Sequence, residues 1–276
     1  MLNVISADGT DVRAHDEGRG PVIVLLHPGL DDGTGLKEVA AILAGRFRVI
    51  RPHRRQYRLD LKADPRLGGS PCSVAEEVDD VLAVVRAVEV PVVLYGHSDG
   101  AVTALETLAA APDLFAGAVI YEPPAVIGPP LGGADGEVLA RARAALAAGK
   151  TGKAMEIFLR DTVRIAAWQA WPAGKATALV PRFRRLAPCQ LDSVEALDRL
   201  GVRLDTYARI TVPTVLLSGD RSPAHLSERL DAIGWVMPNA ERVRWPGRDH
   251  NAHLKHPKQV AQLIQSQARK VLHLPG

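Results

Sequence analysis

The sequence has 276 residues, enough for one large hydrophobic core with an inserted segment. Hydrophobic residues make up 47% and charged residues 24%, a globular composition that excludes a collagen-like or intrinsically disordered chain. The 34 basic and 31 acidic residues leave a net charge of only +3. No apolar run approaches about 18 residues, so we expect neither a membrane-spanning segment nor a membrane partner.

The basic residues are scattered along the chain. Their tightest cluster is short and has one aromatic neighbour, Tyr57; it comprises Arg51, His53, Arg54, Arg55 and Arg58. We interpret it as a solvated loop and expect no nucleic-acid partner. Cys72 and Cys189 are far apart, and the N-terminus lacks an apolar core segment. Both features predict a cytoplasmic protein.

Strands and helices alternate through the first half of the chain. Apolar, β-branched runs predict strands at 4–15, 21–26, 48–51, 91–95 and 117–121. Helical periodicity predicts helices at 36–44, at 101–110 and from a capping box at Ser73 and Glu76. This alternation favours an α/β fold with a mostly parallel sheet flanked by helices.

The alternation stops after the fifth strand. Residues 125–210 contain no clear strand, and helices are predicted near 136–148, 152–167, 173–186 and 193–200. The sheet pattern then resumes with strands at 212–217 and 241–245 and helices at 224–233 and 257–272. We therefore predict an α/β core of residues 1–124 and 210–276 and a helical cap, or lid, of residues 125–209.

The segment Gly96-His97-Ser98-Asp99-Gly100 joins a buried strand directly to a helix. A serine flanked by glycines at this junction is typical of a nucleophile elbow, whose sharp turn leaves no room for a Cβ at either glycine. The elbow exposes the serine at a helix N-terminus, where negative charge is favoured. We predict that Ser98 is a catalytic nucleophile.

A serine hydroxyl needs a base, and that base needs an acid to orient it. His250 follows the last predicted strand and is our candidate base. Asp220 follows the preceding strand and is our candidate acid, with Glu122, after the fifth strand, as the alternative. Asp249 is too close to His250 in sequence to turn back onto its ring.

These segments together resemble the α/β-hydrolase family of serine hydrolases with a helical cap, over nearly all of the chain outside the cap. Residues 250–257 are similar to the family's segment around its catalytic histidine, and residues 218–223 to its acid loop. His27-Pro28-Gly29 stands where the family has its oxyanion loop. The resemblance implies a Ser98–His250–Asp220 triad and no metal or organic cofactor.

The oxyanion hole is predicted from the same resemblance. The backbone N–H of Asp99, directly after the nucleophile, supplies one donor. Pro28 has no N–H, so the second donor is Gly29, with Leu30 as the alternative. The spacing His250-x-x-His253-x-x-His256 could suggest zinc, but Pro257 begins a helix there, and we assign His253 and His256 to packing or the surface.

We predict a serine hydrolase that cleaves an ester or lactone of a small, largely apolar molecule through an acyl-enzyme. The alternatives are a C–C hydrolase, a cofactor-free perhydrolase or haloperoxidase, a biosynthetic lyase or cyclase, and a ligand receptor with little turnover. Lid residues such as Phe158, Trp168 and Trp171 are interpreted mainly as helix packing. A small-molecule substrate is the expected partner, and a homodimer is left open.

Overall fold

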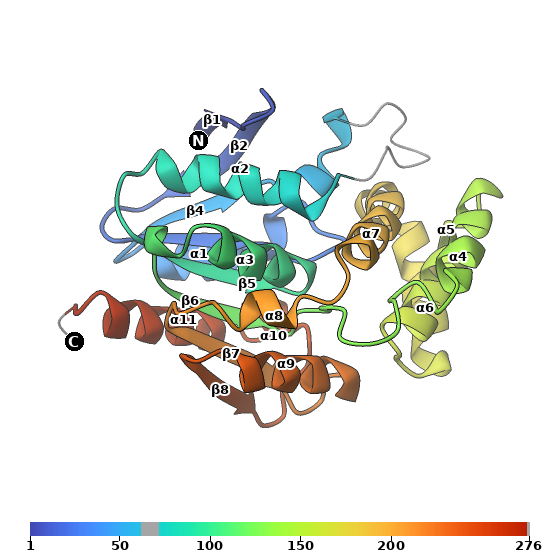
Figure 1. The fold of residues 1–276 in the computed structure, drawn as a ribbon. Helices are drawn as coiled ribbons and strands as arrows, with labels where there is room; N and C mark the ends of the chain where they lie inside the picture. The colour runs from blue at the N-terminus through green and yellow to red at the C-terminus, as the bar shows by residue number, and fades with distance from the viewer. Residues whose placement is uncertain (62–71, 275–276) are drawn as a thin grey trace.

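The computed structural model describes residues 1–61 and 72–274. Its centre is an eight-stranded sheet in the order β1-β2-β4-β3-β5-β6-β7-β8, and only the pairings of β2 are antiparallel (Figure 1). The strands are β1 (Leu2–Ile5), β2 (Asp11–Glu17), β3 (Val22–Leu26), β4 (Arg48–Pro52), β5 (Val92–His97), β6 (Phe115–Tyr121), β7 (Thr214–Gly219) and β8 (Ala240–Trp245). The predicted fold class is confirmed.

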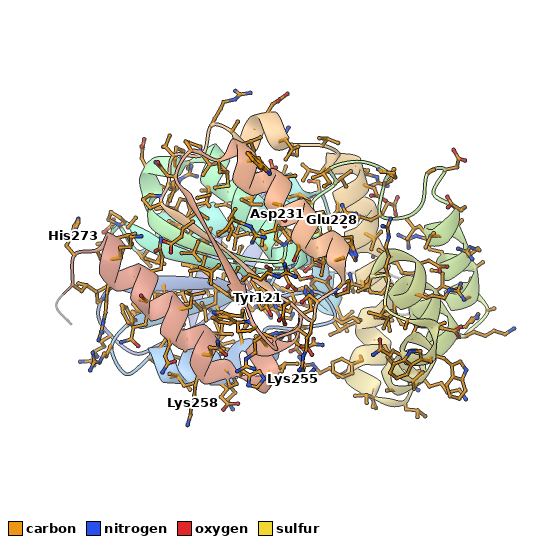
Figure 2. The ribbon with its side chains drawn as sticks, turned by 90° about the horizontal axis from the view of Figure 1, so that it is seen from below. Tyr121, Glu228, Asp231, Lys255, Lys258 and His273 are labelled. Carbon is orange, nitrogen blue, oxygen red and sulfur yellow. The ribbon has the colours of Figure 1, made fainter. Side chains whose placement is uncertain are left out.

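Helices cover both faces of the sheet, which explains why its central strands are apolar throughout. One face packs against α1 (Lys37–Leu43) and α11 (Pro257–Val271), and the other against α2 (Val74–Arg86), α3 (Asp99–Ala110) and α9 (Ala224–Val236). Successive residues of β3 alternate between the two faces: Ile23 belongs to the first cluster and Val24 to the second. Seen from below, Tyr121 lies between α9, with Glu228 and Asp231, and α11, with Lys258 (Figure 2).

Residues 125–209, which we call the insertion, form helices, and all but the last of these gather at one end of the molecule, away from the C-terminus (Figure 1). The last helix packs against α3 and α9. The helices are α4 (Glu137–Ala147), α5 (Thr151–Ile157), α6 (Ala167–Leu179), α7 (Pro181–Leu200) and α8 (Leu204–Tyr207), with a π-helical turn at Phe158–Thr162. No helix within residues 1–61 and 72–274 is long and apolar enough to cross a membrane.

Several predicted helix boundaries inside the insertion are wrong, although the helix predicted near 136–148 is observed as α4. The helix predicted at 173–186 is interrupted at Val180, which is extended and lies directly before Pro181. Proline restricts the preceding residue to extended conformations and is itself well suited to a first helical turn, so α7 begins there. The gap predicted before residue 193 does not exist, because α7 continues through Pro188.

The turn between β5 and α3 depends on two glycines. A Cβ on Gly96 would lie 2.7 Å from the Cα of Ala101, and a Cβ on Gly100 would lie 2.4 Å from the carbonyl oxygen of His27. These contacts involve backbone on neighbouring elements, which cannot easily move aside. The predicted steric reason for both glycines is therefore confirmed.

Gly100→Ala is expected to lower the free energy of unfolding by about 3 kcal/mol, because the added methyl group overlaps the main chain of His27. Urea denaturation measures this change. Gly128→Ala is the matched control, since nothing lies within 4 Å of its Cβ position, and should change stability by less than about 0.5 kcal/mol. Equal stabilities for the two variants would contradict the packing argument.

Candidate active site

Three strand ends bring a serine, a histidine and a carboxylate together. Ser98 follows β5 and precedes α3, with φ 56° and ψ −128°, and its backbone N–H donates to the carbonyl of Tyr121. Glu122 follows β6 directly, and His250 lies in the loop between β8 and α10 (Ala252–Lys255). Tyr121 also holds that loop, because its hydroxyl donates to the carbonyl of Asp249.

The three side chains form a continuous hydrogen-bonded chain. Nδ1 of His250 lies 2.6 Å from Oε2 of Glu122, and Nε2 of His250 lies 3.1 Å from Oγ of Ser98. Because an ionised carboxylate only accepts, Nδ1 carries the proton and Nε2 is left free to accept the Ser98 hydroxyl proton. This is the geometry in which an imidazole can act as a general base on serine.

The contact predicted between Asp220 and His250 is wrong, and the alternative acid, Glu122, holds that position. Asp220 is exposed, and its carboxylate accepts the backbone N–H of Gly247 at 2.7 Å. The backbone N–H of Asp220 donates to Trp245, which directs the residue toward the loop after β8 and away from the ring of His250.

Glu122 is fully buried, and both of its carboxylate oxygens have partners. Oε1 accepts the backbone N–H of Gly219 at 2.7 Å, and Oε2 faces His250. The residue has φ 44°, a left-handed conformation that is uncommon without glycine and is often found at functional sites. Asp249, which we did not expect to contact His250, accepts hydrogen bonds from the backbone N–H of Asn251 and from the side chain of Lys255.

The two predicted oxyanion donors belong to different segments. Asp99 directly follows Ser98, and Gly29 lies in the loop after β3. Asp99 begins α3, and its backbone N–H belongs to the first helical turn. The turn containing Gly29 is held by His27, whose Nε2 accepts the backbone N–H of Arg54 and whose Nδ1 faces the Pro28 carbonyl at 2.9 Å. Whether these N–H groups bind an oxyanion stays a prediction.

The Asp99 side chain lies at the centre of a buried polar network. Its carboxylate accepts hydrogen bonds from Arg54 at 2.8 Å, the Tyr57 hydroxyl at 2.5 Å and Ser193 of α7 at 2.7 Å. Burial opposes the ionised form, but Arg54 and the two hydroxyl donors outweigh it, so the pKa of Asp99 is lowered. The carboxylate is therefore charged and fixed.

The expectation that the arginine cluster is a solvated loop is wrong. Arg54 is buried between Asp99 and Glu77, and Arg55 pairs with Asp80 of α2. A buried guanidinium without an acidic partner would be costly, and each of these has one. The cluster thus anchors the loop after β4 against α2 and α3.

A small cavity of about 50 Å³ opens onto Ser98 and His250. Its apolar wall comes largely from the insertion and includes Leu131, Phe158, Val163, Val194 and Leu197. Phe158 and Thr162 lie on the π-helical turn, a feature that often accompanies functional sites. The cavity suits a small apolar group.

Two polar cavity residues were not identified from the sequence. Gln190 of α7 lies against the oxyanion loop, where a Cβ on Gly29 would be 1.9 Å from its side-chain oxygen. His225 of α9 also lines the cavity. Burial, together with Arg229 and Arg164, lowers the pKa of His225 to about 4, so this imidazole is neutral near pH 7. No local motif distinguishes either residue.

The histidines near His250 form a cluster around His97. His97 is fully buried, parallel to Tyr121 at 4.6 Å, with His253 at 4.4 Å and His250 at 4.7 Å between ring centroids. Burial, and then the neighbouring His250, lower the pKa of His253 to about 4. These contacts agree with the packing role expected for His253.

The fold and this arrangement define a hydrolase scaffold, and comparison with known proteins identifies the family. Residues 23–263 match the model of the alpha/beta hydrolase family, and the chain belongs to that family. No curated protein matches the sequence.

Several solved structures share the whole fold. An alpha/beta hydrolase from Sphaerobacter thermophilus is 24% identical, with a TM-score of 0.77 and coverage of 96% of this chain and 99% of that one. An esterase from Rhodococcus sp. ECU1013 is 21% identical, with a TM-score of 0.72 and 99% coverage of both chains. A meta-cleavage product hydrolase from Pseudomonas fluorescens IP01 is 17% identical, with a TM-score of 0.66 and 98% coverage of both.

The buried histidines should make the protein sensitive to acid. The unfolded chain protonates His253 near pH 6.5, whereas the native state resists protonation until about pH 4. The unfolded state therefore binds more protons in this window, and the free energy of unfolding falls as the pH drops through it. For His253 alone we expect a loss of about 2 kcal/mol between pH 7 and pH 5.

Urea denaturation at the two pH values, for the native protein and His253→Gln, measures this contribution. The variant should be less stable at pH 7 but lose about 2 kcal/mol less on acidification. His273→Gln is the control, since this histidine is not buried and lies near the C-terminus (Figure 2). An identical pH dependence in His253→Gln and the native protein would contradict the argument.

Proposed function

We propose that the protein is a serine hydrolase that cleaves an ester or lactone through Ser98, His250 and Glu122. His250 removes the proton from the Ser98 hydroxyl as Oγ attacks the substrate carbonyl. Glu122 keeps the imidazole in the required tautomer and stabilises the imidazolium that forms. The protonated His250 then donates to the leaving alcohol, and an acyl-enzyme remains.

Deacylation repeats the same chemistry with water. His250 activates a water molecule that attacks the acyl carbonyl, and Ser98 regains its proton as the acid leaves. Backbone N–H groups of Asp99 and Gly29 stabilise both tetrahedral intermediates. The observation that carries the proposal is the unbroken contact chain from Glu122 through His250 to Ser98.

The cavity supports a small and mostly apolar substrate. Its volume of about 50 Å³ favours short acyl groups, and its insertion-derived wall makes residues 125–209 the lid that selects them. Neutral His225 offers one donor and one acceptor, so we assign it to orienting a polar atom of the substrate.

Labelling with a fluorophosphonate probe tests the activated serine. The native protein should be labelled at Ser98, and Ser98→Ala should not react. Nitrophenyl acetate and butyrate should be hydrolysed about tenfold or more faster than the octanoate, because the longer chain does not fit the cavity. Peptide mapping of the adduct and initial rates provide the readouts.

The outcomes separate the candidate chemistries. Labelling with rapid ester turnover supports the esterase. Labelling with negligible turnover favours the C–C hydrolase, perhydrolase or lyase alternatives, which need the same activated serine. Absence of labelling in folded protein contradicts the proposed nucleophile itself.

Glu122→Gln should lower kcat on the best ester by about a thousandfold or more, because the amide no longer enforces the Nδ1–H tautomer of His250. Asp220→Asn is the matched control and should stay within about twofold of the native rate, since Asp220 makes no contact with the ring. Thermal unfolding checks that both variants fold. A large loss in Asp220→Asn with an active Glu122→Gln would reverse the assignment of the acid.

A further inference from the structure

Helix α6 is apolar on two opposite faces. Its inner face, with Ala170, Gly174 and Thr177, is buried and lies so close to α5 that a Cβ on Gly174 would be 2.5 Å from the carbonyl oxygen of Gly152. Its outer face carries Trp168, Trp171, Lys175 and Leu179. At about 100° per residue, these four positions fall within an arc of about 80°, opposite the buried face.

This outer face is exposed to solvent. Trp168 is 77% exposed, Trp171 53% and Leu179 80%. Phe183, in the first turn of α7, is also an exposed large apolar residue. We call Trp168, Trp171, Leu179 and Phe183 the outer stripe. Large apolar side chains gathered on one surface mark a binding face more often than scattered ones do.

The charged residues of the segment that carries the outer stripe are all basic. Between Asp161 and Asp192 the chain has no acidic residue and five basic residues, Arg164, Lys175, Arg182, Arg184 and Arg185. Within the described residues only Arg182 forms ion pairs, with Asp31 and Asp32. The segment is thus more positive than the whole chain, whose net charge is +3.

This charge argues for an anionic occupant and against a second copy of the chain. Two copies meeting through the outer stripe would bring Lys175, Arg184 and their counterparts together, and like charges in contact oppose association. Tryptophan and basic residues on one helical face are instead typical of helices that lie in the interface of an anionic bilayer. Lys175, whose Nζ lies 3.8 Å from the Trp171 ring centroid, fits the same setting.

We propose that the outer stripe docks the protein on the surface of an anionic phospholipid bilayer. Helix α6 lies in the plane of the membrane, Trp168, Trp171 and Leu179 enter the headgroup–acyl boundary, and Lys175 and Arg184 contact lipid phosphates. The sequence-based expectation of no membrane partner rested on the absence of a spanning segment. A helix that lies on the surface needs no such segment.

Vesicle sedimentation with the full chain tests the docking without using catalysis. The native protein should bind vesicles of equal parts phosphatidylcholine and phosphatidylglycerol about tenfold or more tightly than phosphatidylcholine alone, and added salt should weaken the binding. Trp168→Ser/Trp171→Ser/Leu179→Ser should reduce binding by about tenfold or more. Lys175→Glu/Arg184→Glu should do so by a similar factor and provides a second variant should the first fold poorly.

Trp235→Ser is the matched control, because Trp235 is 89% exposed but lies on α9. It should bind as the native protein does. Equal binding of the native protein to neutral and anionic vesicles, or unchanged binding in both multiple variants, overturns the proposal. So does a dimer in lipid-free buffer, seen by light scattering, that the triple variant abolishes, because a second copy would then cover the outer stripe.

Discussion

The sharp turn between β5 and α3 is the constraint on which the site depends. Ser98 has φ 56° and ψ −128°, a conformation that costs about 1–3 kcal/mol for a residue with a side chain. Gly96 and Gly100 allow β5, α3 and the loop after β3 to approach closely enough to hold it, and Asp99 is fixed by Arg54 and Ser193. Packing and buried charge therefore maintain a strained turn whose geometry directs Oγ of Ser98 to His250.

The sequence predicted the elements that carry Ser98, His250 and both candidate acids, but it did not predict which carboxylate contacts His250. Glu122 and Asp220 follow adjacent parallel strands, so both reach the same edge of the sheet. The choice depends on how each chain turns after its strand. Glu122 takes φ 44° and points inward, whereas hydrogen bonds to Trp245 and Gly247 carry Asp220 outward. These are tertiary contacts, which no local pattern encodes.

Burial was the second property that the sequence left open. Arg54 lies in a basic run, yet its partners Glu77 and Asp99 are 23 and 45 residues away, so only the fold reveals that it is buried. For the tryptophans of α6 the error is reversed: the sequence predicted packing, and the side chains are exposed. Their helical spacing fits packing, but Ala170 and Gly174 occupy the inner face and leave Trp168 and Trp171 outside. A helix that is apolar all round does not reveal which face is covered.

Helix α7 joins the insertion to the elements that carry Ser98 and Asp99. The cavity wall therefore has two parts: residues of α7 that also contact this part of the core, and residues before α6 that do not. Ser193 donates to Asp99, Gln190 contacts Tyr57 and lies beside Gly29, and Arg182 pairs with Asp31. Moving α7 would break several buried polar contacts at once, so it behaves as part of the core. Phe158 and Val163 reach the cavity from the segment before α6. Their size can therefore change the shape of the cavity without disturbing the elbow. Gln190 both lines the cavity and contacts Tyr57, which donates to Asp99, so a change at Gln190 alters the cavity and the elbow together.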